Sequence, residues 1–236
     1  MTETATQVQP ETGPSRLIAS PIHTAILLGA IGVQSYRSAM RAGQLRGMVN
    51  LDHMRLYERT ILAEWLMFGL MIVGVWLAGS PLIDVLGERW RSVRAFLLDV
   101  GIAVVFLAGS VVITSLVGAL LGSHGNNEAA RLLRPHGSRE IITWIALSLT
   151  AGICEEAIFR GYLQRQFIAL TKSVPAAILL SAAAFGAAHS YQGYRGVIQI
   201  SLLGVMLGSL AYWRKTVRPG MISHALQDTL AIFAGH

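Results

Sequence analysis

Long apolar runs separated by polar and charged segments are the dominant pattern in this chain. A helix needs about 20 predominantly apolar residues to cross the hydrocarbon core of a bilayer. Residues 61–79, 95–122 and 197–213 form runs of this kind, and the second is long enough to cross with tilt. The pattern therefore predicts an all-α, polytopic transmembrane helical bundle.

Further segments extend this bundle toward the C-terminus. Residues 141–150 are apolar and continue into the stretch 151–162, residues 174–189 are small and apolar, and a last helix is expected over 219–234. With these segments, we predict about six to seven spans, with the active site of the protein within the membrane region.

The N-terminal part of the chain divides less clearly into membrane spans and loops. Residues 17–33 are apolar but short, and Pro21 and His23 interrupt them, so this segment either spans the membrane or lies in its interface. Residues 34–60 carry five arginines and only two acidic residues, which predicts a long basic loop on the cytoplasmic side. Glu64 and Asp99 lie near the ends of their runs and are expected at the interface or in a cavity.

We predict one continuous membrane domain behind a polar tail. Residues 1–15 are polar and contain two prolines, which indicates a disordered N-terminal tail. Residues 16–137 would hold the first helices with their basic loops, and residues 138–236 would form the core that carries the polar motifs. The polar segment 123–139 is expected to be an exposed loop.

The composition supports a membrane protein. Only 14% of the 236 residues are charged and 53% are hydrophobic, whereas a soluble domain carries roughly 25% charge. The net charge of +6 fits arginine-rich loops beside lipid headgroups, so membrane lipids are expected partners and nucleic acid is not. The single cysteine, Cys154, excludes an intramolecular disulfide and a multi-cysteine metal site. The compact size and the absence of organelle signals favour a bacterial cell membrane.

Two adjacent acids, Glu155 and Glu156, interrupt an apolar segment. Ionisable side chains are costly inside a membrane, so they usually face a protein interior or a wet cavity and serve a function. On a helix, Glu156 and Arg160 lie one turn apart and can neutralise each other. Glu155 lies about 100° further round and has no such local partner. We therefore interpret Glu156 as structural and Glu155 as available for chemistry.

Two more polar insertions follow in the last helices. His189 ends the phrase FGAAH, one turn after Phe185, and His224 and Asp228 lie four residues apart on one face. A carboxylate that accepts a proton from water, with imidazoles that orient this water or hold negative charge, is a sufficient hydrolytic set.

A shared site requires an irregular backbone. If one span separates the helices over 174–189 and 219–234, they run parallel, yet His189 ends the first and His224 begins the second. We expect the first helix to stop part-way through the membrane, with residues 190–196 lining a wet cavity.

Three motifs in this order resemble the family of CAAX prenyl endopeptidases and bacteriocin-processing (Abi) intramembrane proteases. Glu-Glu-x-x-x-Arg occurs at 155–160, Phe-x-x-x-His at 185–189, and His-x-x-x-Asp at 224–228, where many members have Asn in place of Asp. The resemblance covers about residues 138–236.

The resemblance implies a role for each motif residue. Glu155 and His189 would activate water, while His224 and Asp228 would bind the substrate carbonyl or stabilise the oxyanion. Because an ionised Asp cannot donate a hydrogen bond, Asp228 would be protonated, orient His224 or ligate a metal.

The remaining motif residues are expected to support the site. The resemblance implies that Glu156 and Arg160 hold the helix and the site in shape. Phe185 is expected to pack beside the site. Cys154 is interpreted as an apolar filler because no base adjoins it.

The four catalytic candidates could also hold Zn²⁺, which usually takes three protein ligands and a water in catalytic sites. However, these ligands, Glu155, His189, His224 and Asp228, are scattered over helices without the local H-E-x-x-H pairing. We favour metal-independent chemistry and keep zinc as the alternative cofactor.

The sequence thus predicts an intramembrane endopeptidase. The resemblance implies peptide or membrane-protein substrates presented in the membrane, either prenylated CAAX-type tails or unprenylated peptides. A proton-coupled transporter and a non-catalytic binding or immunity protein on the same scaffold are the alternatives.

Overall fold

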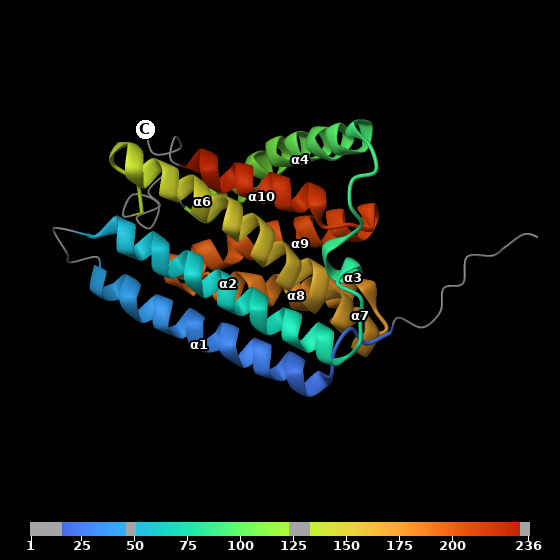
Figure 1. Ribbon diagram of the computed structural model, residues 1–236. Coiled ribbons are helices and arrows are strands. Elements are labelled where there is room, and N and C mark those ends of the chain that lie inside the picture. Colours follow the sequence, from blue (N-terminus) through green and yellow to red (C-terminus); the bar gives the residue numbers. More distant parts are fainter. Residues whose placement is uncertain (1–15, 46–50, 123–132, 232–236) are drawn as a thin grey trace, which may run out of the picture.

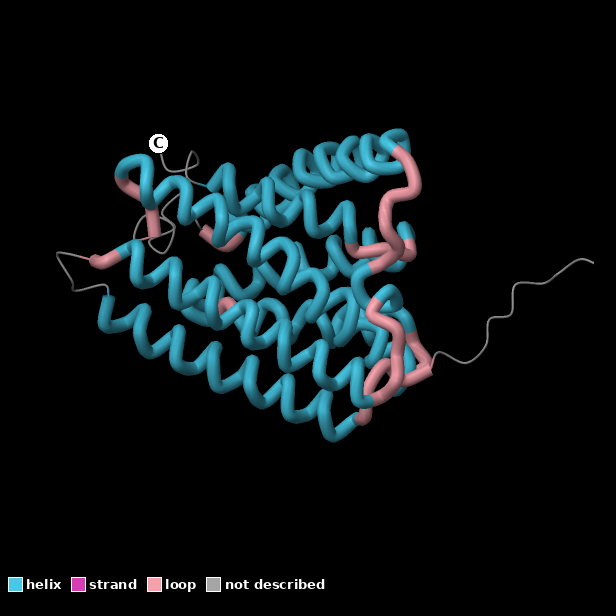
Figure 2. The backbone as a smooth tube through the Cα atoms, in the orientation of Figure 1, coloured by secondary structure: helices cyan, strands magenta, loops and turns pink. Residues whose placement is uncertain are grey.

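The computed structural model describes residues 16–45, 51–122 and 133–231, and within these ranges the chain folds into helices without strands (Figure 2). The all-helical prediction is confirmed for these residues. The predicted tail over residues 1–15 and most of the predicted loop over 123–139 lie outside the described residues.

The helices follow the apolar pattern with extensions at several ends. In chain order the described elements are α1 (Pro21–Leu45), α2 (His53–Leu77), α3 (Ile83–Leu86), α4 (Val93–Leu120), α6 (Gly137–Glu155), the π-helix η1 (Glu156–Gln164), α7 (Arg165–Thr171), α8 (Val174–Ala188), the 3₁₀ turn η2 (Ser190–Gln192), α9 (Gly193–Arg214) and α10 (Arg218–Leu230).

The helices pack side by side in one bundle (Figure 1). α6 lies between α2 and α10, α8 packs against α9, and α1 packs against α2 and α8. α4 packs against α9 and α10 at the edge of the bundle far from α1. α6, which ends at Glu155, is thus held between two neighbouring helices.

Four helical segments are long and apolar enough to cross a membrane: His53–Leu77, Val93–Leu120, Gly137–Thr171 and Ser190–Arg214. Val174–Ala188 is apolar but shorter. Large apolar side chains on the outside of these helices, such as Trp76, Val105 and Leu120, are exposed and suit a lipid environment. These findings agree with a membrane protein, but they do not confirm the predicted six or seven spans.

The predicted basic loop over residues 34–60 is wrong for most of its length. α1 continues to Leu45 and α2 begins at His53, so Arg37 and Arg41 lie on α1, and Arg55 and Arg59 lie on α2. The chain between residues 34 and 45 is rich in Ala, Met, Gln, Leu and Arg, which favour helix. The low apolar content of this segment led to the incorrect prediction of a loop.

Buried polar contacts fasten the start of the chain to the centre of the bundle. The Gln166 side-chain amide donates to the Ala19 carbonyl at 2.7 Å and accepts from the Ala19 N–H at 3.3 Å. His23 lies between the Tyr162 hydroxyl at 3.0 Å and the Leu70 carbonyl at 2.9 Å. His23, to which the sequence analysis gave no role, therefore joins α1, α2 and η1.

Asp99, which was expected at the interface or in a cavity, is buried within the bundle. It is 1% exposed and accepts from Trp90 Nε1 at 2.9 Å. Its carboxylate also pairs with Arg214 at 3.2 Å and with Arg218 at 3.0 Å. Asp99 thus ties α4 to the end of α9 and the start of α10, because two cations from these helices share its charge.

Asp99→Ala is expected to lower the free energy of unfolding by about 3–5 kcal/mol, because it leaves two partly buried arginines without their acid. Glu88→Ala is the matched control, since Glu88 pairs with Arg91 at an exposed site and such pairs contribute about 0–1 kcal/mol. Thermal unfolding in detergent measures both. Equal midpoints for the two variants would contradict the role of Asp99.

Candidate active site

The two adjacent glutamates lie where the backbone changes from α-helix to π-helix. α6 ends at Glu155, and residues Glu156–Gln164 form a π-helix whose residues are all buried. π-helical turns are rare and occur often at functional sites, because they shift the side chains on one side of a helix. Residue periodicity does not reveal this change from α-helix to π-helix.

Glu156 and Arg160 form a fully buried ion pair. Arg160 NH1 donates to Glu156 Oε1 at 2.7 Å, and both side chains are at most 1% exposed. The Arg160 guanidinium also lies 4.1 Å from the centre of the Phe185 ring. At Gly220, a Cβ would lie 3.0 Å from Glu156 Oε2, so α10 approaches this carboxylate closely. This geometry suits the supporting roles predicted for Glu156, Arg160 and Phe185.

Glu155 faces two imidazoles. Its Oε2 lies 4.0 Å from His189 Nε2 and 3.7 Å from His224 Nε2. This oxygen is buried and has no hydrogen-bond partner among the described residues. The structure therefore brings three of the predicted catalytic residues, from α6, α8 and α10, around one carboxylate oxygen.

His189 lies at the point where α8 stops. α8 ends at Ala188, and the 3₁₀ turn Ser190–Gln192 follows before α9 begins. His189 Nδ1 lies 2.9 Å from the Phe185 carbonyl oxygen. Because a carbonyl only accepts, Nδ1 carries the proton, and the neutral ring directs the bare Nε2 toward Glu155. The expected break after His189 is present, but it is a 3₁₀ turn that leads directly into α9.

His224 is held between acids. Its Nδ1 lies 3.1 Å from Glu156 Oε1, and its Nε2 lies 3.6 Å from Asp228 Oδ2. The Asp228 backbone carbonyl accepts from Trp144 Nε1 at 2.9 Å, which fixes this turn of α10 against α6. Asp228 therefore lies beside His224 and is more open to solvent than the other three predicted residues.

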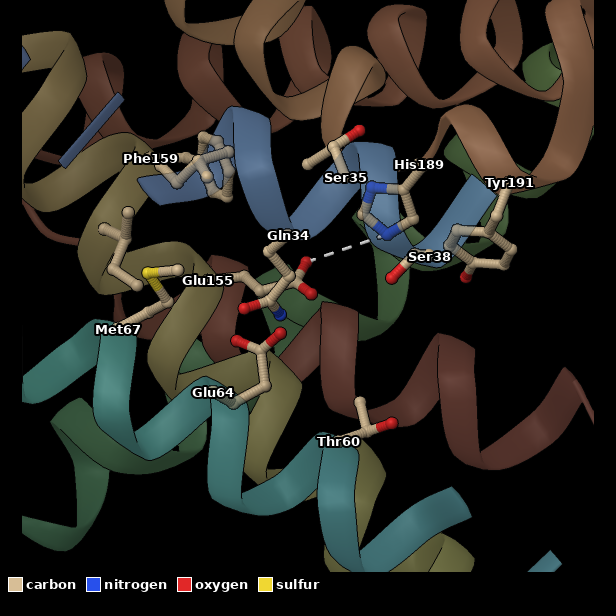
Figure 3. Close-up of a pocket in the computed structure, with 13 residues that line it drawn as sticks. Gln34, Ser35, Ser38, Thr60, Glu64, Met67, Glu155, Phe159, His189 and Tyr191 are labelled. Atoms are coloured by element: carbon tan, nitrogen blue, oxygen red, sulfur yellow. Dashed lines mark ion pairs between the residues drawn. The ribbon is translucent and has the colours of Figure 1, made fainter. Parts of the chain in front are cut away.

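A cavity of about 120 Å³ opens beside Glu155 and His189. Figure 3 shows Glu64 of α2 pointing toward Glu155 across this space, with Gln34 and Ser38 of α1 nearby. The opposite wall of the site thus comes from the first two helices. Glu64, which was expected at the interface or in a cavity, lines this cavity.

Most of the other polar residues of this wall were missed. Ser35 donates to the Ala187 carbonyl at 2.5 Å and lies 2.9 Å from Ser190 Oγ, so α1 is fixed next to His189. Tyr191 lines the cavity from the segment 190–196 that was expected there, and Thr60 lines it from α2 without having been predicted. Single uncharged polar residues in apolar helices are common, so the sequence offered no signal for them, whereas the acid at position 64 within a span was such a signal.

The predicted ligands fit a metal ion only in part. The bare Nε2 of His189, Glu155 Oε2 and His224 Nε2 converge, which is a donor set that suits Zn²⁺. Among the described residues, however, the group whose three ligand atoms all lie within 4.8 Å of one another is a different one. It consists of His53, His136 and Glu140, at the starts of α2 and α6.

Residues 137–230 match a family model described as type II CAAX prenyl endopeptidase Rce1-like. These residues are similar to that family. The Rce1-like domain runs from the start of α6 to the end of α10, so it includes all three motifs and excludes α1 to α4. The predicted resemblance is confirmed, and the family is one of CAAX-type intramembrane proteases. No curated protein and no solved structure matched the chain.

The ion pair inside the Rce1-like domain can be tested by a double-mutant cycle. Arg160→Met leaves Glu156 buried without its cation, so we expect the free energy of unfolding to fall by about 3–5 kcal/mol. Glu156→Gln/Arg160→Met removes both charges and should recover part of this loss. Unfolding in detergent measures the cycle, and a double variant no more stable than Arg160→Met would argue against coupling between the two side chains.

Proposed function

We propose that this protein is an intramembrane endopeptidase in which Glu155 activates a water molecule with His189. The observation that carries the proposal is the convergence of the His189 and His224 Nε2 atoms on the buried Glu155 Oε2, which has no other partner among the described residues. The Rce1-like domain supports the protease class.

The first step is proton transfer from water to Glu155. Glu155 Oε2 and His189 Nε2 are separated by 4.0 Å, which is too long for a direct hydrogen bond. A water that donates one hydrogen to each atom would bridge this gap and turn its lone pairs toward a substrate carbonyl. Glu155 then takes the proton as the water oxygen attacks the carbonyl carbon.

The negative charge that develops on the carbonyl oxygen needs a donor. A His224 ring protonated on both nitrogens donates Nδ1–H to Glu156 and keeps Nε2–H for the oxyanion. Asp228 lies beside the same Nε2 and would orient this ring. When the tetrahedral intermediate collapses, Glu155 returns its proton to the leaving amine, and the carboxylate is regenerated.

The supporting residues would hold the catalytic side chains in position. Glu156 fixes the tautomer and position of His224, Arg160 neutralises Glu156, and Phe185 contacts both the guanidinium and the two imidazoles. If Zn²⁺ is bound, Glu155, His189 and His224 would hold it with Asp228 nearby, and the ion would supply an activated water and polarise the carbonyl.

The proposed substrates are membrane-presented peptides, either prenylated CAAX-type tails or unprenylated peptides. The proposed location is a bacterial cell membrane. Residues 138–236 would supply the catalytic groups, and residues 16–137 would supply the remaining helices. The family match gives no support to the two alternatives, a proton-coupled transporter and a non-catalytic binding or immunity protein.

Peptide cleavage in liposomes, with a fluorogenic membrane-peptide library, tests the proposal. We expect Glu155→Gln and His189→Ala to lower kcat/KM at least 100-fold, because each removes a group that acts on the attacking water. Glu58→Gln changes an exposed acid on α2 and is expected to retain activity. Each assay is repeated with a chelator, since activity that survives chelation indicates glutamate-based chemistry.

One outcome would refute this site, and another would change its mechanism. Cleavage that persists undiminished in both Glu155→Gln and His189→Ala would place the chemistry elsewhere. Activity lost in chelator and restored by Zn²⁺ would instead move the same residues to the metal-dependent class. A non-catalytic binding protein is expected to tolerate the change from Glu155 to Gln better than a hydrolase does.

A further inference from the structure

Two histidines and a glutamate gather at the end of the bundle where both α2 and α6 begin (Figure 1). His53 is the first residue of α2, His136 is the N-cap residue of α6, and Glu140 lies in the first turn of α6. Their three ligand atoms, one from each side chain, all lie within 4.8 Å of one another. No step of the proposed hydrolysis uses these residues, and both histidines lie outside the family-matched segment.

The Glu140 carboxylate lies between the two imidazoles. Its Oε2 lies 3.1 Å from His53 Nδ1 and 3.9 Å from His136 Nδ1, and it accepts from the His136 backbone N–H at 2.7 Å. In a tetrahedral zinc site with bonds of about 2.0–2.2 Å, neighbouring ligand atoms are about 3.3–3.6 Å apart. Shifts of a few tenths of an ångström would therefore bring both distances to the spacing that one zinc ion imposes.

The donor types select a transition-metal ion. Imidazole nitrogens with one carboxylate suit Zn²⁺, whereas Mg²⁺ and Ca²⁺ prefer ligand sets made of oxygen atoms. His136 and Glu140 are four residues apart, the spacing that places two ligands on one face of a helix. His53 adds the third ligand from another helix. This local pair with one distant ligand is the pattern that the catalytic candidates lack.

One of the three ligands is open to water. The side chain of His136 is 72% exposed, whereas those of His53 and Glu140 are mostly buried. The two imidazoles are stacked with planes 13° apart, so one ring must turn before a single ion can lie in both planes. The exposed His136 ring can turn, since χ2 of histidine is a broad torsion. Because the two apolar spans begin at His53 and Gly137, an ion reaches this group from the aqueous side.

The residues next to this group already hold α2 against α6. Tyr57, one turn after His53, packs edge-on against Trp144 with ring centroids 5.5 Å apart, and its hydroxyl donates to the Leu133 carbonyl at 2.6 Å. Trp144 also donates to the Asp228 carbonyl of α10. The two buried ligands thus stand on a packed framework, so little further ordering is needed when an ion binds.

We propose that His53, His136 and Glu140 bind a Zn²⁺ ion that fastens the start of α2 to the start of α6, with water in the remaining coordination position. Helix α2 carries Glu64 and α6 ends at Glu155, so the ion joins the two helices whose acids face each other across the catalytic cavity. Glu155 lies about 22 Å further along α6 than Glu140. This zinc site is therefore separate from the catalytic residues and does not depend on the proposed hydrolysis.

Zinc binding by the full chain in detergent, without a polyhistidine tag, tests the proposal. The background is Glu155→Gln/His189→Ala, which removes two donors of the catalytic centre, so that zinc bound there is not counted. Calorimetric titration with Zn²⁺ is expected to show one equivalent. Zn²⁺ at about 100 times its dissociation constant is expected to raise the midpoint of thermal unfolding by about 5–10 °C. Mg²⁺ at the same concentration is expected to do neither.

Adding His53→Gln or His136→Gln to this background is expected to lower the affinity for Zn²⁺ at least about tenfold, because each removes one ligand. Without metal, the His136→Gln variant should unfold at the midpoint of the background, since its side chain is mostly exposed. Glu58→Gln is the matched control, because it changes an exposed acid near the start of α2 and leaves the three ligands in place.

Three results would overturn the proposal. Zinc that binds equally tightly after both histidines are replaced would be an adventitious surface ion only. No measurable binding to the background would exclude the site, and binding without a rise in the unfolding midpoint would exclude a fastening of α2 to α6. Because the readouts are binding and unfolding, a failure of the proposed peptide hydrolysis would not produce any of these results.

Discussion

The buried ion pair between Glu156 and Arg160 is the interaction on which the centre of this structure depends. Two charges removed from water are costly unless they are paired with each other, and further polar contacts lower the cost. Arg160 meets this condition through Glu156, the Phe185 ring and the Gly204 carbonyl, and Glu156 also contacts His224 Nδ1. Because these partners come from α8, α9 and α10, one buried charge pair sets the positions of three helices around η1.

The same pair explains how two adjacent acids can differ. Glu156 directs its Oε1 to a cation and an imidazole, so its charge is already compensated. Glu155 directs Oε2 to the far nitrogens of His189 and His224 at distances of 4.0 and 3.7 Å, where neither contact is a full hydrogen bond. His224 contacts both acids, so fixing its Nδ1 on Glu156 also aims its Nε2 at Glu155. The reactive geometry is thus a consequence of the structural pair.

The sequence predicts much of this arrangement, because charged residues inside apolar runs must have partners. It identified Glu155, His189 and His224, which share a site, and the Glu156–Arg160 pair, whose partners lie within one turn. It did not place Asp99, since its partners Arg214 and Arg218 are distant along the chain. It also mistook the end of α1 for a loop, because a helix that borders a polar cavity lacks the apolar run by which membrane helices are recognised. The π-helix has no counterpart in residue periodicity.

The two walls of the cavity come from different parts of the chain. The residues proposed to act on the peptide bond lie within 137–230, the family-matched segment, whereas Gln34, Ser38 and Glu64 line the cavity from α1 and α2. The family match covers only the residues of the first wall. It therefore indicates the chemistry, but it does not indicate which peptide is cut. Selectivity in such a site depends on contacts beyond the reacting atoms, because these contacts set which bond is held at Glu155. The N-terminal helices are thus the part of this chain where substrate choice can change without loss of the hydrolytic residues.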